Sequence, residues 1–113
     1  MILGIGIDIV EVDRIKKLCL RYKERFLTRI YTEKELDYCM NKANRYECLS
    51  GRFAAKEAVV KATGGRIRVY KEIEILNSSR GPLVNIIEDD AYKIHVSISH
   101  IEKLAISLAI WEG

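Results

Sequence analysis

The stretch Arg52–Thr63, followed directly by Gly64 and Gly65, constrains the fold of this chain more than any other segment. Its alanines, lysines and glutamates favour an α-helix, and a glycine pair commonly ends one. A weak capping signature upstream places the start of the helix near Arg45. The sequence therefore predicts one long helix, around which the rest of a chain of 113 residues is organised.

At about 100° per residue, this helix carries two polar stripes. Arg52, Lys56 and Thr63 share one side, which we expect to face solvent. Glu57 and Lys61 share another side, within an apolar arc. A carboxylate and an ammonium are costly to bury unless they are paired or bind a ligand. Two interpretations stay open: an i, i+4 ion pair whose stems cover apolar surface, or a functional site.

Residues 2–10 alternate between large apolar and small or polar side chains, as a β-strand does. Glycines in a strand are typical of a place where something approaches the backbone closely, and Gly4 and Gly6 lie on the same face as Asp8. Asp8 is either a surface aspartate beside a bulge or a carboxylate that projects toward a ligand. We expect the opposite, apolar row to face the core: Leu3, Ile5, Ile7 and Ile9.

Three helical segments are predicted between this strand and the C-terminal half. The first begins at about Asp13 as N-cap, a capping box at Thr32 and Glu35 opens the second, and the long helix is the third. Beyond Gly65 the patterns indicate strands at 73–76, 83–87, 94–99 and 104–110, of which the last two form a hairpin. The length and the absence of a linker predict a single domain over 1–113.

The composition excludes several classes of protein. Hydrophobic residues make up 49% and charged residues 31%, as in ordinary globular domains, and the net charge of +3 is too small to indicate a nucleic-acid binder. Cys19, Cys39 and Cys48 form no C-x-x-C pair, so we expect reduced, packed thiols rather than disulfides or zinc ligands. No signal segment or membrane-spanning run is recognisable, and we expect a cytoplasmic protein without a membrane partner.

The first predicted helix has a basic face. Arg14, Lys17 and Arg21 recur at helical spacing, and Arg25 follows closely. Most basic helical faces are simply solvated. The density of positive charge here suggests an acidic partner that is attracted by electrostatic steering.

Tests for known catalytic motifs leave one candidate site. The chain has no glycine motif for dinucleotides, no Walker loop, no nucleophile triad and no zinc-ligand spacing. What remains is Asp8 and Glu57, two oxygen ligands on separate elements, with Lys61 one helical turn after Glu57. Mg²⁺ takes one or two carboxylates and completes its shell with water and substrate phosphates. The residues alone therefore predict a Mg²⁺–phosphate site.

Three segments, in this order, closely resemble the holo-[acyl-carrier-protein] synthase family, the small bacterial type of 4′-phosphopantetheinyl transferase: Gly4–Ile15, Phe53–Ala62 and Val96–His100. The similarity covers nearly the whole chain, and the segments 32–35 and 81–82 also resemble landmarks of the family. The resemblance implies an α+β fold in which an antiparallel sheet packs on the long central helix. It further implies a homotrimer with active sites between subunits.

The family transfers the 4′-phosphopantetheine group of coenzyme A to a serine of apo-acyl carrier protein, in fatty acid biosynthesis, and releases adenosine 3′,5′-bisphosphate. By resemblance, Asp8 and Glu57 are ligands of a Mg²⁺ cofactor, and Glu57, directly or through a water, takes the serine proton. Lys61 matches a lysine that contacts phosphate, and Asp8, Glu57 and Lys61 are thus the implied catalytic residues. Further contacts with coenzyme A are implied for Arg52, Gly64, Gly65, Pro82 and His100.

The resemblance also gives the basic face a partner. Arg14 and Arg21 would dock the acidic helix of the carrier protein, with Lys17 and Arg25 beside them. Two features depart from the family pattern: Arg66 stands where a second spaced glycine is usual, and the segment 88–95 is short enough that we expect no helix there. Two other functions stay open, a noncatalytic binding module for an acidic protein and a different Mg²⁺-dependent phosphoryl-transfer enzyme.

Overall fold

The structure, a computed structural model, describes all 113 residues as an α+β fold. Its elements, in chain order, are β1 (Ile2–Glu11), α1 (Val12–Tyr22), α2 (Glu24–Ile30), α3 (Glu33–Met40), α4 (Arg45–Ala62), the 3-10 turn η1 (Tyr70–Glu72), β2 (Ile73–Ser78), β3 (Gly81–Ile86), β4 (Lys93–His100) and β5 (Leu104–Glu112). The expected C-terminal hairpin and the absence of a helix over 88–95 are both confirmed.

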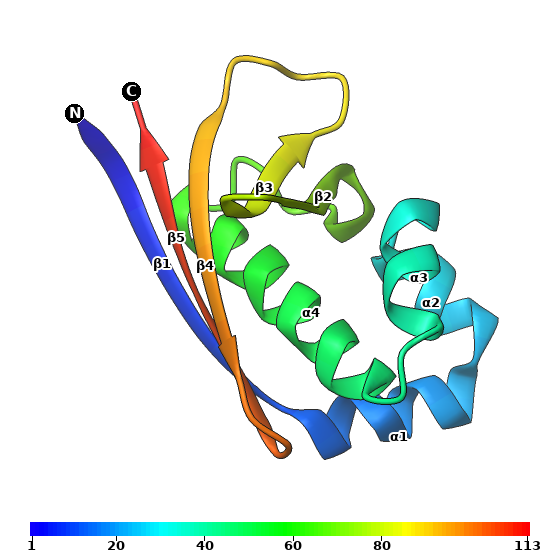
Figure 1. Ribbon diagram of the computed structural model, residues 1–113. Helices are drawn as coiled ribbons and strands as arrows, with labels where there is room; N and C mark the ends of the chain where they lie inside the picture. The colour runs from blue at the N-terminus through cyan, green and yellow to red at the C-terminus, as the bar shows by residue number, and fades with distance from the viewer.

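Strands β1, β5 and β4 form an antiparallel sheet in that order, so that β5 is central and β1 and β4 are the two edges. Strands β2 and β3 form a separate antiparallel hairpin. Helix α4 lies across one face of the sheet, and the β2–β3 hairpin and α1–α3 lie on the same side as α4 (Figure 1). No element covers the opposite face of the sheet (Figure 1).

The small-residue face of the sheet is the one that packs on α4. A Cβ atom at Gly4 would overlap the carbonyl oxygen of Ala62, and one at Gly6 would overlap that of Ala58. Strand β5 continues this face with three buried small residues, Ala105, Ser107 and Ala109. The close approach expected at the two glycines is therefore confirmed, and the helix α4 makes that approach.

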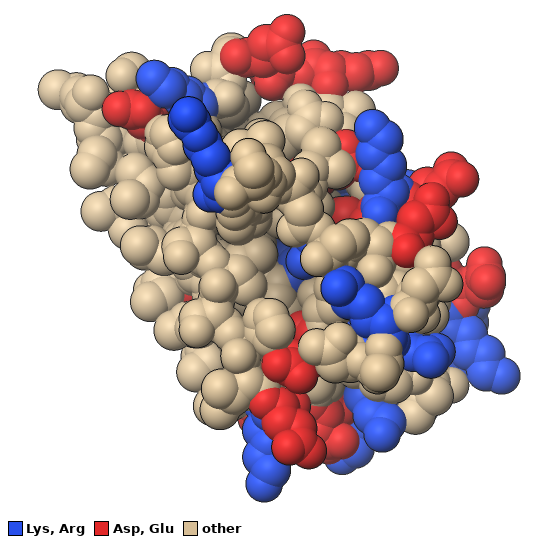
Figure 2. Space-filling view, viewed as in Figure 1, with Lys and Arg blue, Asp and Glu red and all other residues tan.

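The prediction that the large apolar row of β1 faces the core is wrong for this chain. Side chains alternate along a strand, so the packing of the glycine row against α4 turns the large residues outward. These residues are 37–61% exposed, and we call them the outer apolar face: Leu3, Ile5, Ile7 and Ile9 of β1 with Leu104, Ile106 and Leu108 of β5. Figure 2 shows that charged residues are sparse on the side of the sheet and gather over the helices.

The polar stripe of α4 that we expected to face solvent is buried. Lys56 and Thr63 are 0% exposed and Arg52 is 7% exposed, because α3 and the β2–β3 hairpin cover this side of the helix. Helical periodicity separates the two stripes correctly but does not say which one is covered. The bounds of α4 itself agree with the expected helix.

Lys56 is buried as part of a fully satisfied ion pair with Glu35. Its Nζ lies 2.7 Å from Glu35 Oε1 and donates to the carbonyl oxygens of Tyr70 and Ile73. Glu35 Oε2 accepts from the Ile75 backbone amide at 2.8 Å. The pair therefore joins α3, α4, η1 and β2, and such a network is tolerated in a core only because every polar group has a partner.

The helices before α4 differ in detail from those expected. Helix α1 begins at Val12, and Asp13 lies in its first turn rather than at the N-cap. The left-handed backbone of Lys23, with φ of 48°, ends α1 and starts α2, a fourth helix that the sequence did not predict. The capping box at Thr32 is confirmed, since its hydroxyl accepts from the Glu35 amide and the Glu35 carboxylate accepts from the Thr32 amide.

The expectation of three reduced thiols is wrong for two of them. Cys39 at the end of α3 and Cys48 in the first turns of α4 form a disulfide, with their Cα atoms 5.5 Å apart. Composition and spacing gave no sign that the short 41–44 connection brings these two residues face to face. Cys19 is free and buried, as expected, and burial raises the pKa of its thiol to about 11.

Candidate functional site

Asp8 and Lys61 form an ion pair between β1 and α4. Lys61 Nζ lies 3.2 Å from Asp8 Oδ1 and donates to the Ile7 carbonyl oxygen at 2.9 Å. The Lys61 side chain is 53% exposed and that of Asp8 is 16% exposed, so the pair remains open to a ligand. Of the two interpretations left open for Glu57 and Lys61, the i, i+4 pair is excluded, because Lys61 pairs with Asp8 instead.

Glu57 is half-buried, and its carboxylate accepts a hydrogen bond from a residue that the sequence did not single out. The hydroxyl of Tyr70 donates to Glu57 Oε1 at 2.7 Å. Burial raises the pKa of Tyr70 to about 12, helped by this hydrogen bond and by the charges of Glu57 and Asp8. Lys61, which pairs with Asp8, follows Glu57 by one helical turn, so the two carboxylates lie in one cluster at the β1 edge of the sheet. Tyr70 escaped prediction because it lies in an irregular segment without periodicity.

The β1-edge cluster, defined by Asp8, Glu57, Lys61 and Tyr70, has the chemistry of a Mg²⁺–phosphate site. It offers two carboxylates from separate elements and one exposed ammonium. No group of three or more His, Cys, Asp or Glu side chains in the molecule is arranged to hold a metal. A cation at this edge would therefore rely on two carboxylates and on oxygens of its ligand, as Mg²⁺ commonly does.

A second cluster lies on the other side of α4. Arg52, Pro82 and His100 line a cavity of about 220 Å³, together with Tyr38 and Asn77 among others. The Arg52 guanidinium lies 4.6 Å from the centroid of the Tyr38 ring, it belongs to none of the ion pairs, and its buried Nε has no hydrogen-bond partner. Burial lowers the pKa of Arg52. A buried arginine without a carboxylate is a natural partner for a phosphate or another anion.

We call this second cluster, which consists of Arg52, Pro82 and His100, the β4-edge cluster. His100 is the last residue of β4. Its Nδ1 lies within hydrogen-bonding distance of Glu47 Oε1. Gly51 is next to it, and a Cβ there would be only 3.1 Å from Ile98 Cγ2, which explains the glycine inside α4. The structure thus brings three of the residues with expected coenzyme A contacts into one cavity.

The two clusters are separated on this chain. They belong to opposite edges of the sheet, β1 and β4, with β5 between them. Along α4, Arg52 and Lys61 are about 13 Å apart at 1.5 Å per residue. Gly64 and Gly65, which have φ of 61° and 79°, follow α4 at the Lys61 end. The predicted site residues therefore form two separate clusters on this chain rather than one.

The basic residues of α1 and α2 line two adjoining grooves. Arg14, Lys17 and Arg21 of α1 line a groove of about 440 Å³, and Arg25 of α2 lines the other with Arg29, a residue that the sequence pattern did not single out. Leu18 and Tyr22 line both grooves, and Phe26 lines the second. Lys17 also pairs with Asp13 of the same helix at 2.9 Å.

The basic surface adjoins the β1-edge cluster through two stacked rings. The Arg14 guanidinium lies 5.9 Å from the centroid of the Phe53 ring, and Phe53 stacks on Tyr70 with centroids 5.7 Å apart. The positive charge of Arg14 acts on the Tyr70 phenol in opposition to the two carboxylates. A partner bound to α1 would therefore lie beside Glu57.

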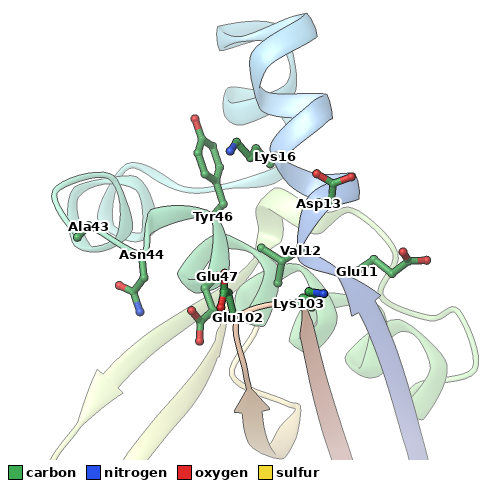
Figure 3. Close-up of a pocket in the computed structure, with 10 residues that line it drawn as sticks. All are labelled: Glu11, Val12, Asp13, Lys16, Ala43, Asn44, Tyr46, Glu47, Glu102 and Lys103. Atoms are coloured by element: carbon green, nitrogen blue, oxygen red, sulfur yellow. The ribbon is translucent and has the colours of Figure 1, made fainter.

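A larger cavity, of about 490 Å³, lies where α1 begins, near the β4–β5 turn (Figure 3). Its lining carries both signs of charge, with Glu11, Asp13 and Glu47 near Lys16 and Lys103. None of the predicted site residues lines this cavity. This cavity is therefore not the predicted site, although it is larger than the cavity at Arg52.

Comparison with known proteins places the chain in a family. Residues 4–109 match the family model described as the 4′-phosphopantetheinyl transferase superfamily. The holo-[acyl-carrier-protein] synthase of Halothermothrix orenii is 46% identical over 123 residues, which cover 99% of this chain and 98% of the relative. The chain belongs to the enzymes of the 4′-phosphopantetheinyl transferase superfamily, within the group of holo-[acyl-carrier-protein] synthases.

Solved structures agree with this assignment. A holo-(acyl-carrier-protein) synthase from Bacillus anthracis, in complex with CoA (3′,5′-ADP), matches with a TM-score of 0.83 and 38% identity, over 99% of this chain and 97% of that one. The Helicobacter pylori enzyme in complex with coenzyme A matches with a TM-score of 0.84 and 32% identity, over 96% of this chain and 99% of that one. The fold described above is thus that of this family.

None of the helices is both long enough and apolar enough to pass through a lipid bilayer.

Proposed function

We propose that this protein transfers the 4′-phosphopantetheine group from coenzyme A to a serine of an apo-acyl carrier protein, in fatty acid biosynthesis. The observation that carries the proposal is the β1-edge cluster, in which two carboxylates and an exposed lysine lie beside a basic helix. Named relatives with this activity support the same reading over the whole chain.

Asp8 and Glu57 would hold a Mg²⁺ ion, which supplies neutralisation of the charge on the coenzyme A pyrophosphate. Glu57, directly or through a water, takes the proton of the carrier serine, and the serine oxygen forms a bond to the phosphorus that bears the pantetheine arm. The bond from that phosphorus to the leaving adenosine 3′,5′-bisphosphate breaks. Lys61, whose side chain is half exposed, stabilises the negative charge of the departing phosphate.

The separation of the two clusters supports an assembly in which neighbouring subunits share each active site, so that each cluster is one half-site. A contact between the β1 edge of one subunit and the β4 edge of the next joins different surfaces, and such contacts generate a ring when the rotation between subunits closes. The family resemblance implies a ring of three. The outer apolar face supports this assembly, because an uncovered apolar surface of this kind marks an interface between proteins. In the ring, Arg52 and His100 of one subunit would contact the coenzyme A whose pyrophosphate lies at Asp8 and Glu57 of its neighbour.

The basic surface of α1 is proposed to bind the carrier protein. Arg14, Lys17, Arg21 and Arg25 supply positive charge, while Leu18 and Tyr22 supply apolar contact area between them. The contacts from Arg14 through Phe53 to Tyr70 support this proposal, because a partner bound to α1 would then lie beside Glu57. The carrier serine would therefore arrive next to the group that takes its proton.

The decisive experiment is intact mass spectrometry of an apo-acyl carrier protein incubated with this protein, coenzyme A and Mg²⁺. We expect a mass gain of one phosphopantetheine group, lost when a chelator is added or when the carrier serine is replaced by alanine. No gain with several carriers would favour the noncatalytic binding module. Phosphoryl transfer that does not need coenzyme A would favour the other Mg²⁺-dependent enzyme.

The matched variant for this assay is Glu57→Gln, which keeps the size of the side chain and removes its charge and basicity. We expect transfer to fall by at least a hundredfold, since both cation binding and proton transfer depend on this carboxylate. Steady-state rates measured by carrier mass give the comparison. Normal kinetics of the variant would contradict the proposed metal site.

A further inference from the structure

The geometry points to Tyr70 as a positioning residue that fixes the orientation of the Glu57 carboxylate for its cation. This inference rests on the proposed function and adds a residue to it. The hydroxyl of Tyr70 donates to Glu57 Oε1 at 2.7 Å, and Glu57 belongs to none of the ion pairs of the chain. The phenol is therefore what restrains this carboxylate, which is otherwise free to rotate about its terminal bond.

Tyr70 is itself held in place independently of Glu57. Its ring stacks on Phe53, with 5.7 Å between centroids and 30° between planes. Its backbone carbonyl accepts from Lys56 Nζ at 2.8 Å, and Lys56 is wholly buried against Glu35. The same stretch of α4 carries Phe53, Lys56 and Glu57. The helix that carries the carboxylate therefore also contacts the tyrosine that orients this carboxylate.

The hydrogen bond makes the two oxygens of the Glu57 carboxylate different. Oε1 is engaged by a neutral donor, so the plane of the carboxylate is set and Oε2 is directed away from the phenol. Lys61 does not compete for either oxygen, because it is engaged by Asp8 and the Ile7 carbonyl. Outer-shell partners of this kind orient metal ligands, and their loss typically costs about 10- to 100-fold in metal affinity or activity.

The test is the variant Tyr70→Phe, which removes one oxygen atom and keeps the ring that stacks on Phe53. The control is Tyr92→Phe, because the Tyr92 ring packs on Trp111, with centroids 5.6 Å apart, outside the β1-edge cluster. For each protein we would measure Mn²⁺ binding by electron paramagnetic resonance, with and without coenzyme A. We would also measure the Mg²⁺ dependence of transfer, kcat and the KM for coenzyme A, and the melting temperature.

We expect Tyr70→Phe to bind Mn²⁺ about tenfold more weakly and to lose about tenfold in kcat, with the KM for coenzyme A and the melting temperature nearly unchanged. Tyr92→Phe should match the parent protein. If the parent needs Glu57 and Tyr70→Phe binds Mn²⁺ as the parent does, the positioning role is overturned and the proposed function stands. If the parent neither binds Mn²⁺ through Glu57 nor transfers the group, the proposed function fails, and this inference fails with it.

Discussion

Helix α4 carries two lysines that pair with carboxylates, and the two pairs differ in almost everything except their chemistry. Lys56 and Glu35 are 0% exposed and lie 2.7 Å apart, and their remaining hydrogen-bonding groups are taken up by backbone atoms. Lys61 and Asp8 lie 3.2 Å apart, with the lysine side chain 53% exposed. The first pair has no hydrogen-bonding capacity left for a ligand, whereas the exposed ammonium of the second pair can still contact one. Burial, rather than residue type, thus separates the structural ion pair from the one that we propose to be functional.

The largest effect that separates the two pairs is expected from Lys56→Met. The substitution leaves the buried Glu35 carboxylate without its counter-charge, which typically costs about 3–5 kcal/mol of unfolding free energy. Urea denaturation at one fixed protein concentration measures this loss. The double variant Lys56→Met with Glu35→Gln should recover part of the loss, because the charge is removed and one acceptor oxygen is kept for one of the two backbone amides. Full stability of the single variant would contradict the role of this pair.

The Cys39–Cys48 disulfide also stabilises the buried region, and its removal is expected to have the next largest effect on the unfolding free energy. The bond closes a short loop between α3 and α4, and loss of such a cross-link costs about 2–3 kcal/mol. Denaturation with and without dithiothreitol measures the difference. The double variant Cys39→Ser with Cys48→Ser should show no response to the reductant. A parent protein that is equally indifferent to the reductant would argue against the disulfide.

Lys61→Met tests the second pair, for which we expect a larger effect on activity than on stability. The lysine of this pair is half exposed and Asp8 is largely buried, so we expect the unfolding free energy to fall by only about 1 kcal/mol. The value of kcat/KM should nevertheless fall about 10- to 100-fold, because the charge that we propose stabilises the leaving phosphate is lost. Lys34→Met, at an exposed position of α3, is the matched control. A Lys61 variant that is strongly destabilised and fully active per folded molecule would reverse the assignment of the two lysines.

The smallest effect is expected from Arg14→Ala, which acts on the partner and not on either pair. We expect the KM for the carrier protein to rise several-fold at low ionic strength and the difference to shrink as salt is added, since exposed charges are screened. The parent and Arg80→Ala, a variant of the β2–β3 turn, provide the baseline for the salt series. A uniform loss of kcat at every salt concentration would assign Arg14 to the chemistry instead of docking.

Much of this molecule could be predicted from its sequence because the relevant signals are local. The capping box at Thr32, the length of α4 and the C-terminal hairpin depend on residues close in the chain, and each agrees with the structure. Asp8 and Glu57 could be singled out because a charged side chain stood in an apolar or glycine-lined pattern. Their proximity to each other then followed from the way β1 packs on α4, where Lys61 pairs with Asp8 one turn after Glu57.

The errors concern which side of an element is covered. Helical periodicity placed Lys56 on a polar stripe. Only the packing of α3 and β2 against α4 shows that this stripe is buried. Alternation in β1 likewise separated two faces, but the glycine face was the one that α4 needed for close contact. Tyr70 and the Cys39–Cys48 bond gave no local signal at all, because both depend on contacts between separate elements.

The position of the β1-edge and β4-edge clusters at opposite edges of the sheet has a genetic consequence under the proposed assembly. If each active site combines the β1 edge of one subunit with the β4 edge of another, an Asp8→Asn allele and an Arg52→Leu allele are each inactive alone. Their products can still meet in mixed rings, where one intact edge faces another. Random mixing in equal amounts would restore about a quarter of the sites. Two defective alleles would therefore complement each other, which a chain with its whole site on one subunit could not achieve.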